Sequence, residues 1–275
     1  MNKIINKIYP VSKKNIHNSD GLYLKTVLSK LNIKKPIYYA NFLTSFDGRI
    51  ATFDKRIKKL LTPENIKNDI DFQLFCQLHA QADCLVTNTH YVKGLHEGYY
   101  GDILSIKNKK LNDWRKENNI KEQEIIILSN SLDFPIDKNL ELYKEKIIIL
   151  TTSKNLKKIN ELRDHKYKVI KYKEKNVSAV NLNKFILKKS YKSVYFIAGP
   201  RIVEQMISKN LLDRYYCSTS LQMLGTKNYD TIIRGDYLKK NVNLDLIEMY
   251  IHQEKKVKIQ TIFQIFNIKG KRDVY

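Results

Sequence analysis

The chain has 275 residues, with 50 Lys and Arg against 28 Asp and Glu, a formal net charge of +22, and 43% hydrophobic residues. That length and apolar content can bury a core without a metal or disulfide staple, and they exclude a largely disordered protein. The longest apolar runs, such as Ile125–Leu128, are far shorter than the ~18 residues of a membrane span.

The sequence predicts a reduced, cytoplasmic protein. Lysines interrupt the stretch MNKIINKIYP, where an export signal would need an apolar run. The three cysteines are odd in number and form no C-x-x-C pair, which favours free thiols in the core.

The positive charge raises the question of nucleic-acid binding, because Lys and Arg clusters bind phosphate backbones. Here the lysines are spread over every segment, and no zinc-finger, helix-turn-helix or ribonucleoprotein motif is present. We therefore expect no dedicated nucleic-acid role and no membrane partner, although the positive field would attract phosphorylated metabolites.

The first 35 residues form a predicted basic N-terminal extension with one short helix, from about Leu22 to Leu31. Residues 36–275 form the predicted domain. Its first strand is Ile37–Leu43, a β-rich run after a proline. Thr62-Pro63-Glu64 is typical of a helix start, and the apolar residues that follow, from Ile66 to Leu78, repeat at close to 3.6 residues.

Strands and helices then alternate along the chain. The predicted strands are Cys84–Val86, Glu124–Leu128, Lys146–Leu150, Val169–Tyr172, Ser193–Ala198 and Arg214–Ser220. The predicted helices are Lys109–Asn118, Asn155–Asp164, Leu182–Lys189 and Arg201–Lys209. Two long strands, Leu244–Gln253 and Lys256–Phe266, joined by a turn at Glu254-Lys255, predict a C-terminal antiparallel hairpin.

This order predicts an α/β fold with a doubly wound, mostly parallel sheet and an antiparallel hairpin at one edge. In such sheets, ligands bind beyond the carboxyl ends of the parallel strands. The segments at these ends are rich in hydroxyls and amides, which suit phosphate, ribose and carboxamide groups. They are Thr44–Arg49, Thr87–His90, Ser129–Ser131, Thr151–Ser153 and Gly199–Arg201.

Gly199-Pro200 is the sharpest of these segments, because it stands between a strand and a helix. A glycine there lets a ligand approach the backbone, and the helix start offers N–H groups to a diphosphate. The glycine could equally serve only the tight turn. The chain has no G-x-G-x-x-G fingerprint, which argues against an ordinary Rossmann dehydrogenase. Asp47-Gly48 likewise fits either a turn or a carboxylate that faces a ligand.

The order of the motifs resembles the reductase domain of riboflavin biosynthesis, the RibD C-terminal family. The resemblance covers about Pro36 to Phe266. It rests on ANFLTSFDGRIAT, LHAQADCLVTNT, IILSNSLDFPI, IIILTTS and the long segment from YFIAGPRIVEQ to LQMLG. The family has a dihydrofolate reductase-like fold, and membership implies a 5-amino-6-(5-phosphoribosylamino)uracil reductase that uses NADPH.

The resemblance also implies where the cofactor would bind. The diphosphate falls on the helix after Gly199 and Pro200, at the backbone of Arg201, Ile202 and Val203. The nicotinamide falls near Leu43, Ser45, Asp47, Asn88 and Thr89. The adenosine and its 2′-phosphate fall near Ser129, Asn130, Thr152 and Lys154. Asp47 is the one candidate for a catalytic acid.

The sequence departs from the family's pattern mainly on the substrate side. The family's lysine falls on Asn41, its arginine on His79, its threonine on Tyr91 and its motif glutamate on Ile197. The downstream aspartate falls on Leu95. We therefore expect NADPH binding to be retained more firmly than the riboflavin-pathway substrate. His79 also fits a plain helix-end residue, and residues Tyr91–Gly101 fit either a lid or a simple connection.

Three hypotheses follow. The chain is an NADPH-dependent reductase acting on that substrate or on another small molecule, an inactive module that binds a cofactor or metabolite, or a basic nucleic-acid binder. The chain has no zinc-deaminase or H-E-x-x-H motif, so no metal is expected. It also has no phosphate-binding P-loop. The terminal hairpin is a candidate contact for a homodimer.

Overall fold

The computed structural model describes residues 3–30, 35–197, 199–233, 238, 241–252 and 259–269. An eleven-stranded sheet runs through the molecule in the order β2-β1-β13-β14-β11-β3-β10-β6-β7-β8-β9, and a three-stranded sheet β12-β4-β5 lies apart from it. The main strands are β1 (Ile4–Tyr9), β2 (Ile16–Asn18), β3 (Ile37–Ser45), β6 (Cys84–Asn88), β7 (Glu124–Ser129), β8 (Ile147–Thr151), β9 (Lys168–Lys171), β10 (Ser193–Phe196), β11 (Arg214–Ser220), β13 (Asn243–His252) and β14 (Thr261–Lys269).

The seven strands from β11 to β9 are parallel, and β14, β13, β1 and β2 continue the sheet in antiparallel fashion. This confirms the predicted mostly parallel sheet with a C-terminal antiparallel hairpin. The central strands are apolar on both sides: all five residues of β8, IIILT, are buried. Such runs form because helices cover both faces of a parallel sheet.

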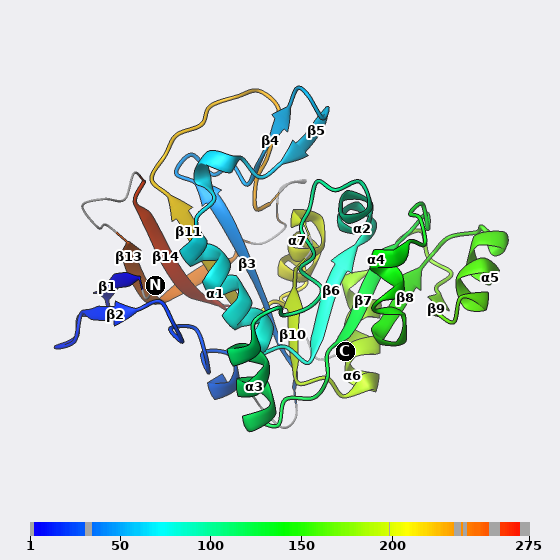
Figure 1. Cartoon of the computed structure of the whole chain (residues 1–275), viewed down its shortest axis with the longest axis horizontal. Coiled ribbons are helices and arrows are strands. Elements are labelled where there is room, and N and C mark those ends of the chain that lie inside the picture. Colours follow the sequence, from blue (N-terminus) through cyan, green and yellow to red (C-terminus); the bar gives the residue numbers. More distant parts are fainter. Residues whose placement is uncertain are drawn as a thin grey trace.

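The helices are α1 (Asp69–Ala80), α2 (Thr89–His96), α3 (Lys109–Glu117), α4 (Lys138–Glu141), α5 (Leu156–Asp164), α6 (Ala179–Lys189) and α7 (Pro200–Ser208). One apolar cluster joins α1, α2, α4 and α5 to one face of the sheet. A second cluster joins α6 and α7 to the other face. Figure 1 shows α1 in front of β3, with α6 and α7 behind the sheet.

Three short strands form the small sheet: β4 (Ala51–Asp54), β5 (Lys59–Leu61) and β12 (Tyr229–Asp230). The β4–β5 hairpin follows β3 and lies beyond its carboxyl end (Figure 1). The small sheet was not predicted, because its strands are short and one of them comes from a distant part of the sequence.

The N-terminal segment differs from the prediction. Strand β1 pairs with β13, β2 pairs with β1, and Ile5 is fully buried. In place of the expected helix from Leu22, the described residues form turns and the short 3-10 helix η1 (Leu28–Lys30). The outer edge of β13 is therefore occupied by β1 rather than open for a homodimer contact.

The helix that we expected to start at Thr62-Pro63-Glu64 starts later. Residues Glu64–Ile66 form the short 3-10 helix η2, and α1 begins at Asp69, where Asn68 caps it by accepting the N–H of Asp71 at 2.8 Å. Helix α2 replaces the first part of the connection expected over Tyr91–Gly101. The expected turn at Glu254-Lys255 lies outside the described residues.

Candidate active site

A cavity of about 340 Å³ opens where β3, β6 and β10 end. These three strands are adjacent and parallel, so their carboxyl ends converge at one edge. The cavity is lined by Asn41, Phe42, Leu43, Ile50, Ala51, Leu60, Thr62, Phe75, Asn88, His90, Tyr91, Tyr100, Gly101, Ile103, Ile197, Gly199, Pro200 and Asp230. Of the sequence-predicted site residues, it brings together Asn41, Leu43, Asn88, Tyr91, Ile197, Gly199 and Pro200.

The start of α7 borders this cavity. Gly199 occupies the N-cap position with extended backbone, φ −66° and ψ 176°, and no side chain caps the first turn. A Cβ atom built on Gly199 would meet only the Asn88 side-chain nitrogen, at 3.9 Å. The helix start therefore presents backbone N–H groups and an open approach to a ligand. Arg201 is exposed, whereas the Val203 side chain is fully buried, so Val203 can offer a ligand only its backbone.

Asn41 is held in place on the floor of the cavity. The Tyr195 hydroxyl donates to Asn41 Oδ1. The amide nitrogen of Asn41 is therefore the group that remains to donate a hydrogen bond to a ligand. The Tyr195 ring stacks on Tyr39 at 4.8 Å between ring centres, and Phe75 lies against it at 5.6 Å. This buried aromatic support fixes the direction of a polar group that faces the cavity.

Tyr91 fixes one wall. Its hydroxyl donates to the Gly101 carbonyl and accepts the N–H of Ile103, both at 3.0 Å. Tyr100 stacks on Tyr91 at 6.0 Å, and its hydroxyl lies 2.9 Å from Nε2 of His90. The segment after α2 is therefore tied down through side-chain bonds.

The small sheet forms the opposite wall, through Ile50, Ala51, Leu60 and Asp230. Lys59 of β5 joins the two walls: its ammonium lies 4.4 Å from the centre of the Tyr99 ring and pairs with Glu97. Sequence reasoning missed these wall residues, because only the tertiary fold brings them to the ends of the strands. Phe75, in contrast, belongs to the predicted apolar face of its helix.

Asp47 has a structural role that the sequence could not distinguish from catalysis. One oxygen accepts the Ser45 hydroxyl at 2.5 Å, the other accepts the N–H groups of Leu224 at 3.1 Å and Gly225 at 3.0 Å, and Arg49 pairs with it. Desolvation raises the pKa of Asp47, but these bonds outweigh it and lower the pKa to about 2. Asp47 thus stays ionised near neutral pH, and its role as a catalytic acid stays a prediction. Neither Ser45 nor Asp47 lines the cavity.

His79 does not line this cavity either, and its assignment to the substrate stays a prediction. It is 1% exposed, its Nε2 donates to the Ile103 carbonyl at 3.0 Å, and its Nδ1 lies 3.1 Å from the Gln123 side-chain nitrogen. Burial lowers its pKa to about 4. The residue is a neutral core histidine that links α1 to the segment before α3.

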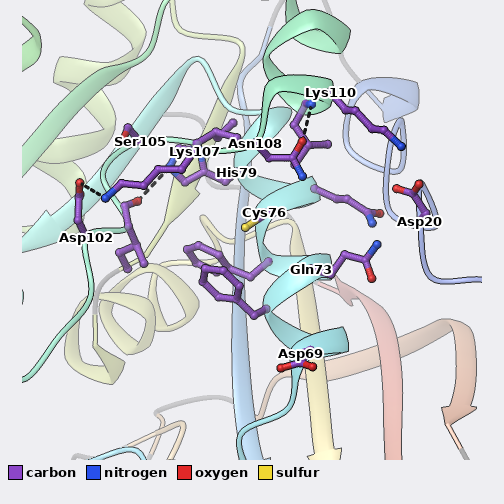
Figure 2. Close-up of a pocket in the computed structure, with 16 residues that line it drawn as sticks. Asp20, Asp69, Gln73, Cys76, His79, Asp102, Ser105, Lys107, Asn108 and Lys110 are labelled. Atoms are coloured by element: carbon purple, nitrogen blue, oxygen red, sulfur yellow. Dashed lines mark hydrogen bonds and ion pairs between the residues drawn. The ribbon is translucent and has the colours of Figure 1, made fainter. Parts of the chain in front are cut away.

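His79 instead lies beside a second cavity of about 390 Å³, between α1, α3 and residues 102–108. Figure 2 shows Asp69, Gln73 and Cys76 along α1 on one side of this cavity, and Lys107 paired with Asp102 on the other. Phe75 and Ile103 line both cavities and so separate them. Burial raises the pKa of Cys76 to about 11, so its thiol is not a ready nucleophile.

The residues expected near adenosine form, together with Thr89 from the predicted nicotinamide end, a separate polar group at the ends of β7 and β8. Thr89 donates to the Ser129 hydroxyl at 2.7 Å, and Thr152 donates to the Asn130 side-chain oxygen at 3.2 Å. Asn130 in turn donates to Asn176 at 2.7 Å, and Lys154 is exposed nearby in sequence. None of these residues lines either of the two cavities.

Two general findings concern the described residues. None of their helices is long and apolar enough to cross a membrane. Within the same part of the chain, no three His, Cys, Asp or Glu side chains gather closely enough to hold a metal ion.

The model of the RibD C-terminal domain matches residues 36–257 of the sequence. The chain belongs to this family. Membership confirms the resemblance seen in the sequence and makes the chain a relative of the reductases of riboflavin biosynthesis. A comparison with curated proteins by sequence finds no match.

Solved structures share the fold of this RibD C-terminal domain at low identity. RibD from Acinetobacter baumannii is 13% identical with a TM-score of 0.58, over 86% of this chain and 58% of that one. A pyrimidine reductase-like protein from Corynebacterium diphtheriae is 16% identical with a TM-score of 0.66, over 90% and 98%. The riboflavin biosynthesis reductase Rib7 of Saccharomyces cerevisiae is 14% identical with a TM-score of 0.57, over 90% and 96%. The chain thus spans about three-fifths of the Acinetobacter protein.

Proposed function

We propose that the chain is an NADPH-dependent oxidoreductase of the riboflavin-biosynthesis type, which transfers hydride to a substrate like 5-amino-6-(5-phosphoribosylamino)uracil. Family membership supports the class of reaction. The observation that carries the proposal is the cavity at the ends of β3, β6 and β10, bordered by the uncapped start of α7.

The residues around α7 fit a dinucleotide. Gly199 leaves space where a side chain would stand, and the backbone N–H groups of Arg201, Ile202 and Val203 belong to the first turn, where a diphosphate is favoured. Leu43 and Asn88 would border the nicotinamide, with Ser45, Asp47 and Thr89 behind them. Ser129, Asn130, Thr152 and Lys154 would meet the adenosine end, where Lys154 can pair with a 2′-phosphate.

In this proposal, the bound cofactor supplies the hydride, and the chain supplies binding, orientation and exclusion of water. The apolar walls from Phe75, Ile103 and Leu60 keep water from the reacting centre. Asn41, fixed by Tyr195, donates a hydrogen bond to the substrate. Tyr91 and Ile197 shape the remaining wall.

The test is calorimetric titration of the full chain with NADPH and with NADH. We expect NADPH to bind more tightly, because Lys154 and the neighbouring amides have a charged group to meet on it. NADPH oxidation is then followed at 340 nm with 5-amino-6-(5-phosphoribosylamino)uracil and with a panel of pterins and carbonyl compounds. Absence of any binding at millimolar NADPH would reject the reductase.

The second candidate is a member of the fold that binds a cofactor or metabolite without turnover. It is favoured by the structural role of Asp47 and by Asn41, Tyr91 and Ile197 in the cavity, at positions where the family places other groups. Tight NADPH binding without oxidation across the whole panel would support it over the reductase.

A further inference from the structure

His90 and Tyr100 form a hydrogen-bonded pair on the wall of the candidate active site, and the function proposed above does not use it. Nε2 of His90 lies 2.9 Å from the Tyr100 hydroxyl, and both side chains line the cavity. Within the described part of the chain, neither the hydroxyl nor the imidazole ring makes another hydrogen bond. Because a phenol can both donate and accept and an imidazole has two nitrogens, each group can still bind a ligand.

Other groups near the cavity are less suited to give up a proton. The carboxyl of Asp47 is ionised near neutral pH and does not line the cavity. The Tyr91 hydroxyl lines it but donates to the Gly101 carbonyl. The Tyr100 hydroxyl, in contrast, is bonded only to another group that carries a proton, the His90 ring.

Packing holds the pair at the cavity. The Tyr100 ring stacks on Tyr91 with 6.0 Å between the ring centres. His90 stands in the first turn of α2, two residues after Asn88. The Asn88 side-chain nitrogen is the atom nearest to the open face of Gly199, at the start of α7. The pair therefore shares one cavity with the helix start where the cofactor is proposed to bind.

The surroundings of His90 favour release of its proton. Partial burial lowers its pKa below the ordinary value. The positive charges of Lys59 on β5 and Arg201 on α7 lower the pKa as well. The negative charges of Asp230 on β12 and Glu97 after α2 act against them. The ring is also exposed, so it can exchange its proton with water.

Tyr100 keeps its proton until a ligand takes it. Burial raises its pKa, an effect that Lys59 opposes and Asp230 supports. Above the pKa of His90, the phenol O–H donates to the neutral imidazole. When His90 is protonated, its Nε2–H donates to the phenol oxygen, and the phenol O–H is free to donate to a ligand. A proton on His90 thus reverses the hydrogen bond and directs the Tyr100 proton into the cavity.

We propose that Tyr100 contacts the acceptor atom of the substrate and donates a proton to it, and that His90 replaces this proton. The substrate carbon of a C=N or C=O bond receives the hydride of bound NADPH, and the electron pair of the double bond moves to the nitrogen or oxygen. That atom takes the phenol proton and becomes N–H or O–H. The Nε2 proton of His90 passes to the phenol oxygen, and His90 regains a proton from water. The hydride source rests on the proposed function, whereas the contact with the acceptor atom is tested without it.

The contact is tested with 4-nitrophenolate, whose oxygen imitates the negative charge that develops on the acceptor atom. The probe is titrated by its absorbance into the full wild-type chain, Tyr100→Phe and the matched control Tyr99→Phe, without NADPH. Tyr99 neighbours Tyr100 in the sequence but does not line the cavity. The wild type and the control should bind the probe roughly tenfold more tightly than Tyr100→Phe, which lacks the donor to a charged oxygen.

The proton transfer is tested by the pH profile of NADPH oxidation, with the substrate that the wild type reduces. The kcat/KM of the wild type should fall as the pH rises through the pKa of His90, because the imidazolium is the active form. The midpoint should coincide with that of the His90 ring measured by NMR in the free chain. Tyr100→Phe should lower kcat by about 100-fold or more with unchanged affinity for NADPH, and His90→Gln should abolish the fall with pH.

Equal affinity for 4-nitrophenolate in the wild type and in a folded Tyr100→Phe would overturn the assignment, as would no binding of this probe at millimolar concentration. The two proposals fail separately. A chain that binds the probe through Tyr100 but binds no NADPH keeps this contact and loses the reductase. NADPH oxidation that Tyr100→Phe leaves unchanged keeps the reductase and rejects the pair as its proton donor.

Discussion

The ring of Tyr100 lies directly over Gly94, so that a Cβ atom at position 94 would come within 2.1 Å of the ring carbon Cδ2. Gly94 stands in the middle of α2, and Tyr100 lines the candidate active site. The glycine is therefore required for packing and not for helix geometry. It lets the chain after α2 fold back and form a wall of the cavity.

Replacing Gly94 by alanine should destabilise the protein by roughly 1–3 kcal/mol, because the methyl group forces Tyr100 out of place. In a Tyr100→Ala background, the same substitution should instead stabilise by about 0.5–1 kcal/mol, because alanine is the better helix former. Urea unfolding of the wild type, the two single variants and the double variant measures both effects. A loss of the same size in both backgrounds would contradict the packing argument.

Substitutions at Gly199 should weaken NADPH binding progressively, from Gly199→Ala to Gly199→Val. A Cβ atom fits the free protein, because the nearest atom to it lies at 3.9 Å and φ is −66°. The side chain would instead occupy the path by which a diphosphate reaches the backbone of α7. Calorimetry measures the affinity and thermal unfolding confirms the fold. Unchanged affinity in a folded Gly199→Val would move the diphosphate elsewhere.

Asp47→Asn should lower the free energy of unfolding at pH 7 by roughly 1–3 kcal/mol, because bonds to a charged acceptor are lost at Leu224 and Gly225. The folded pKa of Asp47 lies below its unfolded value, so its stabilisation is present above about pH 4 and is lost as the pH falls toward 2. The difference between wild type and variant should shrink over that range. Urea unfolding at each pH measures this difference, and a constant difference over the whole range would contradict the role of Asp47.

His79 should make the wild type lose stability in mild acid. Its folded pKa of about 4 lies below its ordinary value, so the unfolded chain binds the proton first, and stability falls as the pH drops from about 6.5 toward 4. The loss from this residue should reach roughly 2 kcal/mol by pH 5. In His79→Gln the fall between pH 7 and 5 should be smaller by that amount. Urea unfolding at each pH measures the difference, and an equal fall in both proteins would contradict this account of His79.

The central strands could be predicted because each is marked by a short apolar run in its own sequence. Runs such as Ile147–Leu150 are apolar throughout, which fits a strand buried on both faces. The strand β1 was missed because only one of its residues, Ile5, is buried, while Ile4 and Ile8 are 52% and 40% exposed. Its pairing with β13 joins segments more than two hundred residues apart, which no local pattern records.

The part of the site that lies at the carboxyl ends of the parallel strands could be predicted, because the order of strands and helices in the sequence indicates a parallel sheet. Asn88 ends β6 and Gly199 follows β10, and these two strands are parallel neighbours, so the end-of-strand rule places the two residues together. The rule does not say which way a side chain turns: His79 at the end of α1 faces the core, and Asp47 bonds to a distant loop.

The pairing of β1 with β13 also covers what would otherwise be a long edge of the sheet. The two edge strands of the sheet are short: β2 has three residues and β9 has four, and β9 begins and ends with lysine. Short and charged edge strands discourage the addition of a further strand. Without the first eighteen residues, the ten-residue β13 would become the rim of the sheet. A truncated chain would then offer the unpaired backbone groups of β13 to its neighbours, and we expect it to aggregate more readily than the intact chain.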